Sequence, residues 1–360
     1  MDIDGTGTTT IASAGDINAG GAVVFGANKS GTITTSGDVV TSNDNITFTR
    51  AVTLGGNVDL DPTGGSAGNI LFSSTIATGD KNLTLAAGSA GTVTLSGNLT
   101  GGGAMTVRDG AVQSYQVLTV DSLDIQDATN SVTLNGALTT DGAVNIDSGG
   151  TIAINGAINT SSSSSGTVDI DGTGTTTIAA AGDINAGGAV AFGANKNGAL
   201  TTSGDIDTSN DNITFTRAVT LGGNVDIDTT GASAGNIVFS STIATAGNNL
   251  TLDAGTAGNV TLSGNLTGKG AMTVRDGSVQ SYQVLTLGSL TISDATTSVT
   301  LNGALTADGA VDIDSGDTIA INAAINTNSS ASGTVAIAVS YTHLRAHETR
   351  HDLVCRLLLE

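Results

Sequence analysis

The chain has 360 residues, a formal net charge of −21, 51 glycines, one proline, one cysteine and no tryptophan. Charged residues make up only 12% of it, which is too few for a charge-rich disordered tail, and the acidic balance argues against nucleic-acid binding. No apolar stretch approaches the length of a membrane-spanning helix. Hydrophobic residues reach 38% and are mostly aliphatic, so the sequence predicts a core of small side chains.

Along the chain, apolar residues recur in pairs that are separated by one polar residue. This period of two predicts strands with one buried face, and the Gly, Asn and Asp clusters between the pairs predict turns. We therefore expect an all-β body. The pairs in its first half are Val23/Phe25, Ile46/Phe48, Val58/Leu60, Ile70/Phe72, Leu83/Leu85, Val93/Leu95, Met105/Val107, Leu123/Ile125, Val132/Leu134, Val144/Ile146 and Ile152/Ile154.

The second half of the sequence repeats the first at a constant offset. GAMTVRDG begins at Gly103 and again at Gly270, and about four positions in five are identical without a gap. We divide the chain into copy 1 (residues 1–168), copy 2 (169–338) and a tail (339–360). Met1 stands where the later copies have valine, so we expect a start inside a longer tandem array, with open, self-associating strand edges at both ends.

Turn signals recur about every 20–25 residues, which is typical of a solenoid. We expect a parallel β-helix of roughly 14 to 16 coils, in which each strand stacks on its counterpart about 4.8 Å away. Phe25, Phe48 and Phe72 should form an inward stack of rings. Asparagines precede many strands. Asparagine tolerates the left-handed turn conformation, and stacked asparagine side chains can hydrogen-bond along the rod. In copy 1 these are Asn45, Asn57, Asn69 and Asn82.

Aspartates two residues apart share one face of a strand, so each such pair presents two carboxylates together. The pairs could bind structural calcium between coils or carry out acid–base chemistry. The alternative is a solvated face that keeps the rod soluble. We expect no cofactor, with structural calcium as the alternative. The pairs are Asp2/Asp4, Asp59/Asp61, Asp169/Asp171, Asp226/Asp228 and Asp312/Asp314.

One repeated stretch departs from this pattern, VRDGAVQSYQVLTV in copy 1. Its Tyr115 and Gln116, with Tyr282 and Gln283 in copy 2, could contact a carbohydrate, whereas a coil insertion or an imperfect turn is the simpler interpretation. Four arginines should pair with aspartates at the surface. They are Arg50, Arg108, Arg217 and Arg275.

The strings GGNVDLD, SAGNILFSSTIAT, NLTLAAGSAGTVTLSGNLTG and SVTLNGALTTDGAVNID resemble the passenger repeats of large bacterial exoproteins. The most similar families are the filamentous-haemagglutinin-like adhesins of two-partner secretion and related autotransporter adhesins. The resemblance covers residues 1–338. It implies a right-handed parallel β-helix, an outer-membrane secretion partner, and an extracellular or cell-surface location. It also implies a glycan or surface receptor as the binding partner.

The tail differs from the body in composition. Residues 1–338 contain 29 aspartates but no glutamate, whereas the last 22 residues hold both glutamates, all three histidines and Cys355. Val339–Thr349 and Leu353–Glu360 read as the two ends of a translated sequencing adapter, so we interpret residues 339–360 as a non-native tail that is disordered or forms a short helix. His347, Glu348 and His351 match the zinc-protease motif HExxH, but this short tail offers no distant third ligand and no cleft. We treat the motif as an artefact.

These observations favour a non-enzymatic stalk or adhesive segment of a secreted or surface-displayed exoprotein. The alternative is a β-helical protein that binds or cleaves polysaccharides. Such an enzyme would need long loops with clustered catalytic residues, whereas the body has short turns and only eight basic residues.

Overall fold

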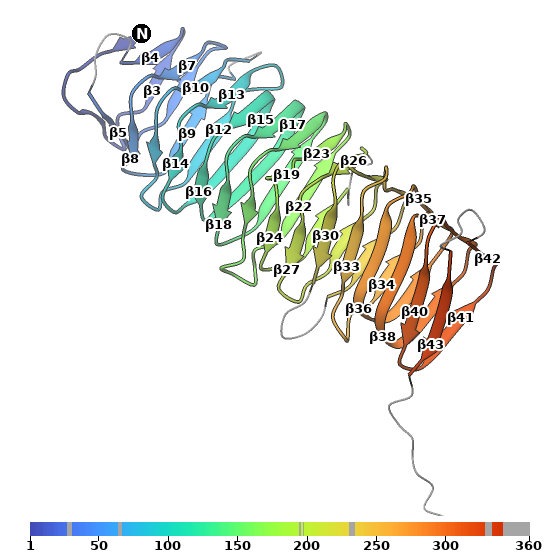
Figure 1. Cartoon of the computed structure of the whole chain (residues 1–360). Coiled ribbons are helices and arrows are strands. Elements are labelled where there is room, and N and C mark those ends of the chain that lie inside the picture. Colours follow the sequence, from blue (N-terminus) through green and yellow to red (C-terminus); the bar gives the residue numbers. More distant parts are fainter. Residues whose placement is uncertain are drawn as a thin grey trace, which may run out of the picture.

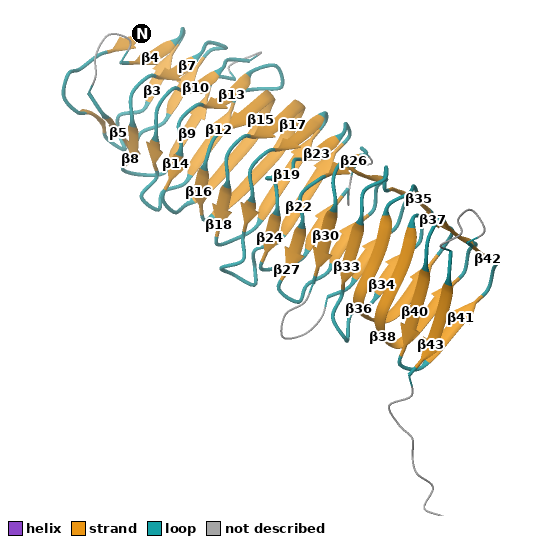
Figure 2. Ribbon diagram, viewed as in Figure 1, coloured by secondary structure: helices purple, strands orange, loops and turns teal. Residues whose placement is uncertain are grey.

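The computed structural model describes residues 1–26, 31–63, 67–193, 196, 198–229, 235–327 and 333–340. Within these ranges all helices and strands assigned are β-strands, with no α-helix among them. The strands wind into one continuous rod (Figure 1, Figure 2). The pairings between named strands are parallel. The prediction of an all-β parallel β-helix is therefore confirmed.

The strands stack in three columns, which we name faces 1, 2 and 3. Each coil contributes one strand to each face in turn. Two long strands of each copy bend around a corner and serve two faces. These are β15 and β17, whose first halves lie on face 3 and second halves on face 1, and β36 and β38, which run from face 2 to face 3.

Face 1 contains β1 (Asp2–Ile3), β4 (Val23–Phe25), β7 (Ile46–Phe48), β10 (Ile70–Phe72), β13 (Thr92–Leu95), β15 (Ala104–Tyr115), β17 (Ser122–Leu134), β20 (Thr151–Ile154), β23 (Thr176–Ile178), β26 (Leu200–Thr202), β29 (Val219–Leu221), β32 (Ile243–Ala244), β35 (Leu266–Thr267), β37 (Leu285–Leu287), β39 (Leu305–Ala307) and β42 (Ile325–Asn326).

Face 2 contains β2 (Thr9–Ile11), β5 (Ile33–Thr35), β8 (Val52–Leu54), β11 (Ile76–Ala77), β14 (Leu99–Thr100), β16 (Leu118–Val120), β18 (Leu138–Thr140), β21 (Ile158–Asn159), β24 (Ile184–Ala186), β27 (Ile206–Thr208), β30 (Val225–Asp228), β33 (Leu250–Asp253), β36 (Ala271–Tyr282), β38 (Ser289–Leu301), β40 (Val311–Ser315) and β43 (Val335–Val339).

Face 3 contains, besides the shared long strands, β3 (Ile17–Ala19), β6 (Val39–Thr41), β9 (Val58–Asp61), β12 (Leu83–Ala86), β19 (Val144–Ser148), β22 (Val168–Gly172), β25 (Val190–Phe192), β28 (Ile213–Phe215), β31 (Ile237–Phe239), β34 (Val260–Leu262) and β41 (Thr318–Ile321).

The core follows the predicted period of two. All eleven apolar pairs named for the first half lie in strands and are buried. Ile33 pairs with Val52, and Ile158 pairs with Ile184, so the chain returns to the same face after close to the expected coil length. The sequence pattern missed short strands of face 2 such as β5 (ITT) and β11 (IA), because neither contains an alternating pair of large apolar residues.

The predicted stack of phenylalanines is also confirmed. The rings of Phe25 and Phe48 lie 4.5 Å apart between centroids, and those of Phe48 and Phe72 lie 4.6 Å apart, nearly parallel in both cases. Copy 2 forms the same stack with Phe192, Phe215 and Phe239. Because each ring occupies the same place in successive coils, the rings pack face to face inside the rod.

Copy 2 is turned by one face relative to copy 1. In the described chain, the 21 strands from β1 to β21 fill 23 positions, because β15 and β17 serve two faces each, and 23 is not a multiple of three. The phenylalanine stack therefore lies on face 1 in copy 1 and on face 3 in copy 2. Equivalent side chains of the two copies thus point in different directions around the rod.

Candidate functional site

Asparagine ladders run along the outside of the rod. The side-chain oxygen of Asn45 accepts a hydrogen bond from the backbone N–H of Asn69 at 2.9 Å, and Asn69 accepts one from Thr92 at the same distance. The predicted hydrogen bonding along the rod is therefore confirmed. The left-handed conformation that asparagine tolerates is used at other positions, since among the described asparagines only Asn43 and Asn210 have a positive φ, of 69° and 80°.

Aspartates take the same role on a neighbouring ladder in copy 2. Asp183 accepts the backbone N–H of Asp205 at 3.0 Å, and Asp205 accepts that of Asp226 at 2.7 Å. Each carboxylate is thereby held at a fixed place one coil from the next. Successive rungs of a β-sheet are about 4.8 Å apart, so this ladder aligns negative charges along one side of the rod.

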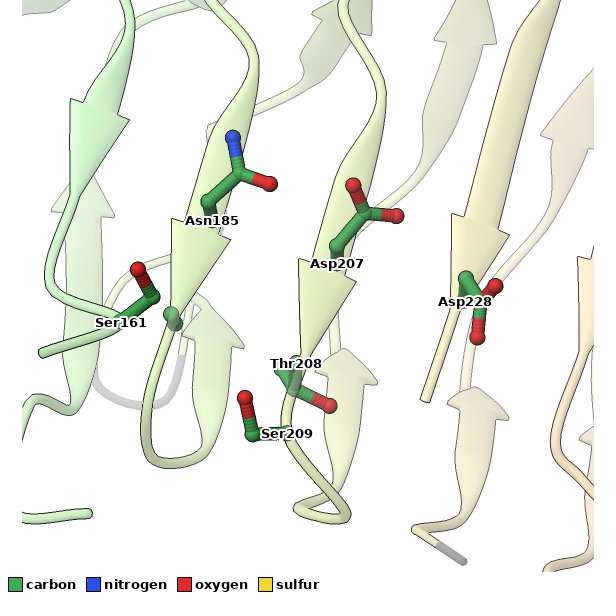
Figure 3. Close-up of a pocket in the computed structure, with 7 residues that line it drawn as sticks. Ser161, Asn185, Asp207, Thr208, Ser209 and Asp228 are labelled. Atoms are coloured by element: carbon green, nitrogen blue, oxygen red, sulfur yellow. The ribbon is translucent and has the colours of Figure 1, made fainter. Parts of the chain in front are cut away.

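A second row of carboxylates runs beside this ladder. Asn185, Asp207 and Asp228 occupy matching positions on β24, β27 and β30, and Asp228 is followed by Asp253 on β33. Figure 3 shows the side chains of Asn185, Asp207 and Asp228 on three adjacent strands. Beyond Asp253, Asp276 and Asp294 continue the row on β36 and β38. We name Asp207, Asp228, Asp253, Asp276 and Asp294 the acidic column.

The first two members of the acidic column line a shallow pocket of about 310 Å³. A second pocket, of about 270 Å³, lies against the aspartate ladder and contains Asp205 and Asp226. The first pocket is lined by Ser161, Asn185, Ala186, Asp207, Thr208, Ser209 and Asp228 (Figure 3).

Asp207 is the most perturbed carboxyl group of this region. Burial raises its pKa to about 6, and the charges of Asp228, Asp205, Asp226 and Asp183 act in the same direction. Asp207 therefore exchanges a proton near neutral pH, while ordinary aspartates stay ionised. Such a group can serve as a proton donor or bind a cation in place of the proton.

The acidic column is a feature of copy 2 alone. Its counterpart in copy 1 begins with Val40, which lies opposite Asp61, and continues with Ala86, which lies opposite Asp109. Two substitutions between the copies, Val40 to Asp207 and Ala86 to Asp253, thus complete the row. Sequence analysis missed this site, although the gapless alignment of the copies contains the signal.

The predicted aspartate pairs are only partly on a solvated face. Asp59 and Asp61 share a face, and burial raises the pKa of Asp59, with the charge of Asp61 acting in the same direction. Asp171, however, is only 3% exposed, so the alternative of a solvated face does not hold for this residue. Among the described residues, no group of three or more His, Cys, Asp or Glu is arranged to hold a metal ion. Structural calcium therefore stays a prediction.

The four arginines divide into two classes. Arg108 and Arg275 are surface partners as predicted, with Asp59 at 2.8 Å and Asp226 at 2.7 Å. Arg50 and Arg217 are instead buried, which corrects the prediction for these two.

The buried arginines bind loops of the rod. Arg50 donates to the backbone oxygens of Gly5 at 2.9 Å and Ile3 at 3.1 Å. Gly26 leaves the space for this side chain, because a Cβ there would lie 2.2 Å from the Arg50 Nε. The guanidinium satisfies carbonyl groups where the coil turns, so its role is structural.

Two tyrosines of the repeats, Tyr115 and Tyr282, also lie inside the rod. Tyr115 and Tyr282 are 0% exposed, and their hydroxyls donate to the side chains of Gln113 and Gln280 at 2.8 and 2.7 Å. Neither ring presents a face to a carbohydrate, because each fills the core at the end of a long strand. Gln116 and Gln283 are partly exposed, and their contact with a carbohydrate stays a prediction.

The motif residues His347, Glu348 and His351 lie outside the described residues, as does the tail from residue 341 onward. None of the described segments forms an apolar helix of membrane-spanning length. No protein-family model, no curated protein and no solved structure matches the chain.

Proposed function

We propose that this chain is a stalk segment of a secreted or surface-displayed bacterial exoprotein, which holds an adhesive region away from the cell. The observation that carries the proposal is the unbroken stacking of parallel strands over both copies. In such a rod each coil is stabilised by its two neighbours, so length can grow by repetition.

The distribution of polar side chains supports a scaffold. The ladders of asparagine and aspartate serve backbone N–H groups, and the buried arginine and tyrosine side chains hydrogen-bond within the rod. The ladders and the buried arginines therefore connect one coil to another, whereas each tyrosine hydrogen-bonds within its own strand. The acidic surface would also keep a long rod soluble through charge repulsion.

The alternative is a polysaccharide-cleaving protein, and the acidic column is the observation that favours it. Glycoside hydrolysis uses two carboxyl groups, one of which holds a proton near neutral pH. Asp207, with its pKa of about 6, and Asp228 on the adjacent strand meet this chemical requirement in one pocket.

One experiment separates the two proposals. The full chain and its Asp207→Asn variant are incubated with acidic and neutral polysaccharides, and both released oligosaccharides and retained polysaccharide are measured. A stalk releases no product with either protein, and binding without cleavage supports an adhesive role. Release by the unmodified chain that is lost in Asp207→Asn would instead support the hydrolase.

A further inference from the structure

The last strand of the rod has a buried counterpart in the middle of the chain. β43, β22 and β1 are equivalent strands of the repeat, because Val335 and Val168 hold the place that Met1 holds in copy 1. In β22, Val168 and Ile170 are 1% and 0% exposed. In β43, Val335 and Ile337 are 48% and 43% exposed, because among the described residues this strand pairs only with β40.

The repeat also shows what covers such a strand. β22 is covered by β25, in the register Val168 to Val190 and Ile170 to Phe192. The counterpart of β25 in copy 1 is β4, which holds Val23 and Phe25. On the corresponding edge, β4 is covered only by the two-residue strand β1. β22 and β25 pair inside the rod, and their counterparts β43 and β4 lie near opposite ends of the described rod.

We propose that two molecules of this chain join end to end, and that β43 of one molecule replaces β1 of the other as the partner of β4. The strands that follow then also find their usual partners. β2 stacks on β41 as β23 stacks on β20, and β3 stacks on β42 as β24 stacks on β21. The second molecule is turned around the rod axis by one face. The same rotation relates copy 2 of the repeat to copy 1 within one chain.

The composition of β43 suits it to this exchange. Its five residues, Val-Ala-Ile-Ala-Val, are uncharged, whereas β1 begins with Asp2 and pairs through two residues only. A longer apolar strand offers more hydrogen bonds and more buried surface to β4. Because the two joined surfaces differ, each added copy leaves a new open end, so joining produces filaments and not closed dimers.

The first test is site-directed cross-linking of full-length chains that also carry Cys355→Ser. Ala336 of one copy should lie opposite Val24 of the next, as Asp169 lies opposite Ala191. A mixture of the Ala336→Cys and Val24→Cys variants is therefore expected to form a disulfide-linked dimer under oxidation. If the two ends stacked with β1 still in place, β1 of one molecule would lie on β41 of the other. This arrangement would instead bring Ala320 of β41 near Asp2. A second mixture combines the Ala320→Cys and Asp2→Cys variants. A cross-link in this second mixture overturns the proposal, and so does the absence of a cross-link in both mixtures.

The second test is sedimentation velocity over a range of protein concentrations. We expect Ile337→Asp to weaken self-association by about tenfold or more, because it places a charge in the junction. Val112→Asp is the matched control, since Val112 is 42% exposed and lies on β15, away from both ends of the rod. Equal loss in both variants, or an unmodified chain that stays monomeric at every concentration, contradicts end-to-end joining.

Discussion

Asp207 lies opposite Asp228 in the parallel register of β27 and β30, whereas its copy-1 counterpart Val40 lies opposite Asp61. The two copies thus share one backbone but differ in charge at this point. Like charges on adjacent rungs destabilise a sheet, so copy 2 carries an electrostatic cost that copy 1 avoids. This difference offers a matched comparison within one molecule.

Replacing Asp207 with asparagine should stabilise the protein at pH 7.5. The pKa of Asp207 is about 6 in the folded protein, above its ordinary value of 3.8, so the folded state binds this proton more tightly than the unfolded state. The resulting stability is present below pH 4 and is lost as the pH rises through 6. Urea unfolding should show a gain of about 1 to 2 kcal/mol for Asp207→Asn at pH 7.5.

The pH dependence provides the control for this variant. At pH 4 the Asp207 carboxyl group is protonated in the folded protein, so the stabilising effect of Asp207→Asn should be much smaller than at pH 7.5. Val40→Asp is the reciprocal change and should destabilise copy 1 at pH 7.5 more than at pH 4. An equal effect of Asp207→Asn at both pH values would show that packing, not charge, is responsible.

Arg217→Ala should be far more damaging than Arg275→Ala. Arg217 is 3% exposed and donates hydrogen bonds to Thr176 Oγ1 at 2.9 Å and to the backbone oxygen of Ile170. Its loss leaves buried acceptors unpaired and should cost about 2 to 3 kcal/mol. Arg275 is half exposed in its ion pair with Asp226, and its loss should cost less than about 1 kcal/mol. Thermal or urea unfolding of the two variants tests this ranking, and equal losses would refute it.

Phe48→Ala should loosen the rod locally. Phe48 lies between Phe25 and Phe72 with ring separations of 4.5 and 4.6 Å, and its removal leaves a cavity that should cost about 3 to 5 kcal/mol. Because each coil contacts only its neighbours, hydrogen exchange should rise in β4, β7 and β10 and stay unchanged around Phe215. Faster exchange throughout copy 2 would contradict this view of local coupling.

Asn69→Ala should remove one rung of an external ladder. The Asn69 oxygen accepts hydrogen bonds from the backbone and hydroxyl of Thr92, both at 2.9 Å, and their loss should cost about 1 kcal/mol. Asn69→Asp is the control, because a carboxylate keeps the acceptor and should retain most of the stability. Unfolding midpoints of the two variants give the comparison, and equal destabilisation would show that the acceptor does not matter.

The amino-acid sequence by itself determined the local structure of this protein. Alternation at pairs such as Ile70 and Phe72 identified the buried strands, and the position of Asn69 before a strand identified its ladder. Both predictions succeeded because the repeat brings equivalent residues of successive coils together, so spacing along the chain becomes spacing along the rod.

Only the tertiary structure decided how the coils are distributed around the rod. The long strands β15 and β17 each turn a corner, which shifts copy 2 to another face and separates equivalent side chains. It also decided that Arg217 and Tyr282 lie inside and that Asp207 meets Asp228. These outcomes depend on which coil lies above and below a residue, and a pattern read along one strand contains no information on its neighbours in the stack.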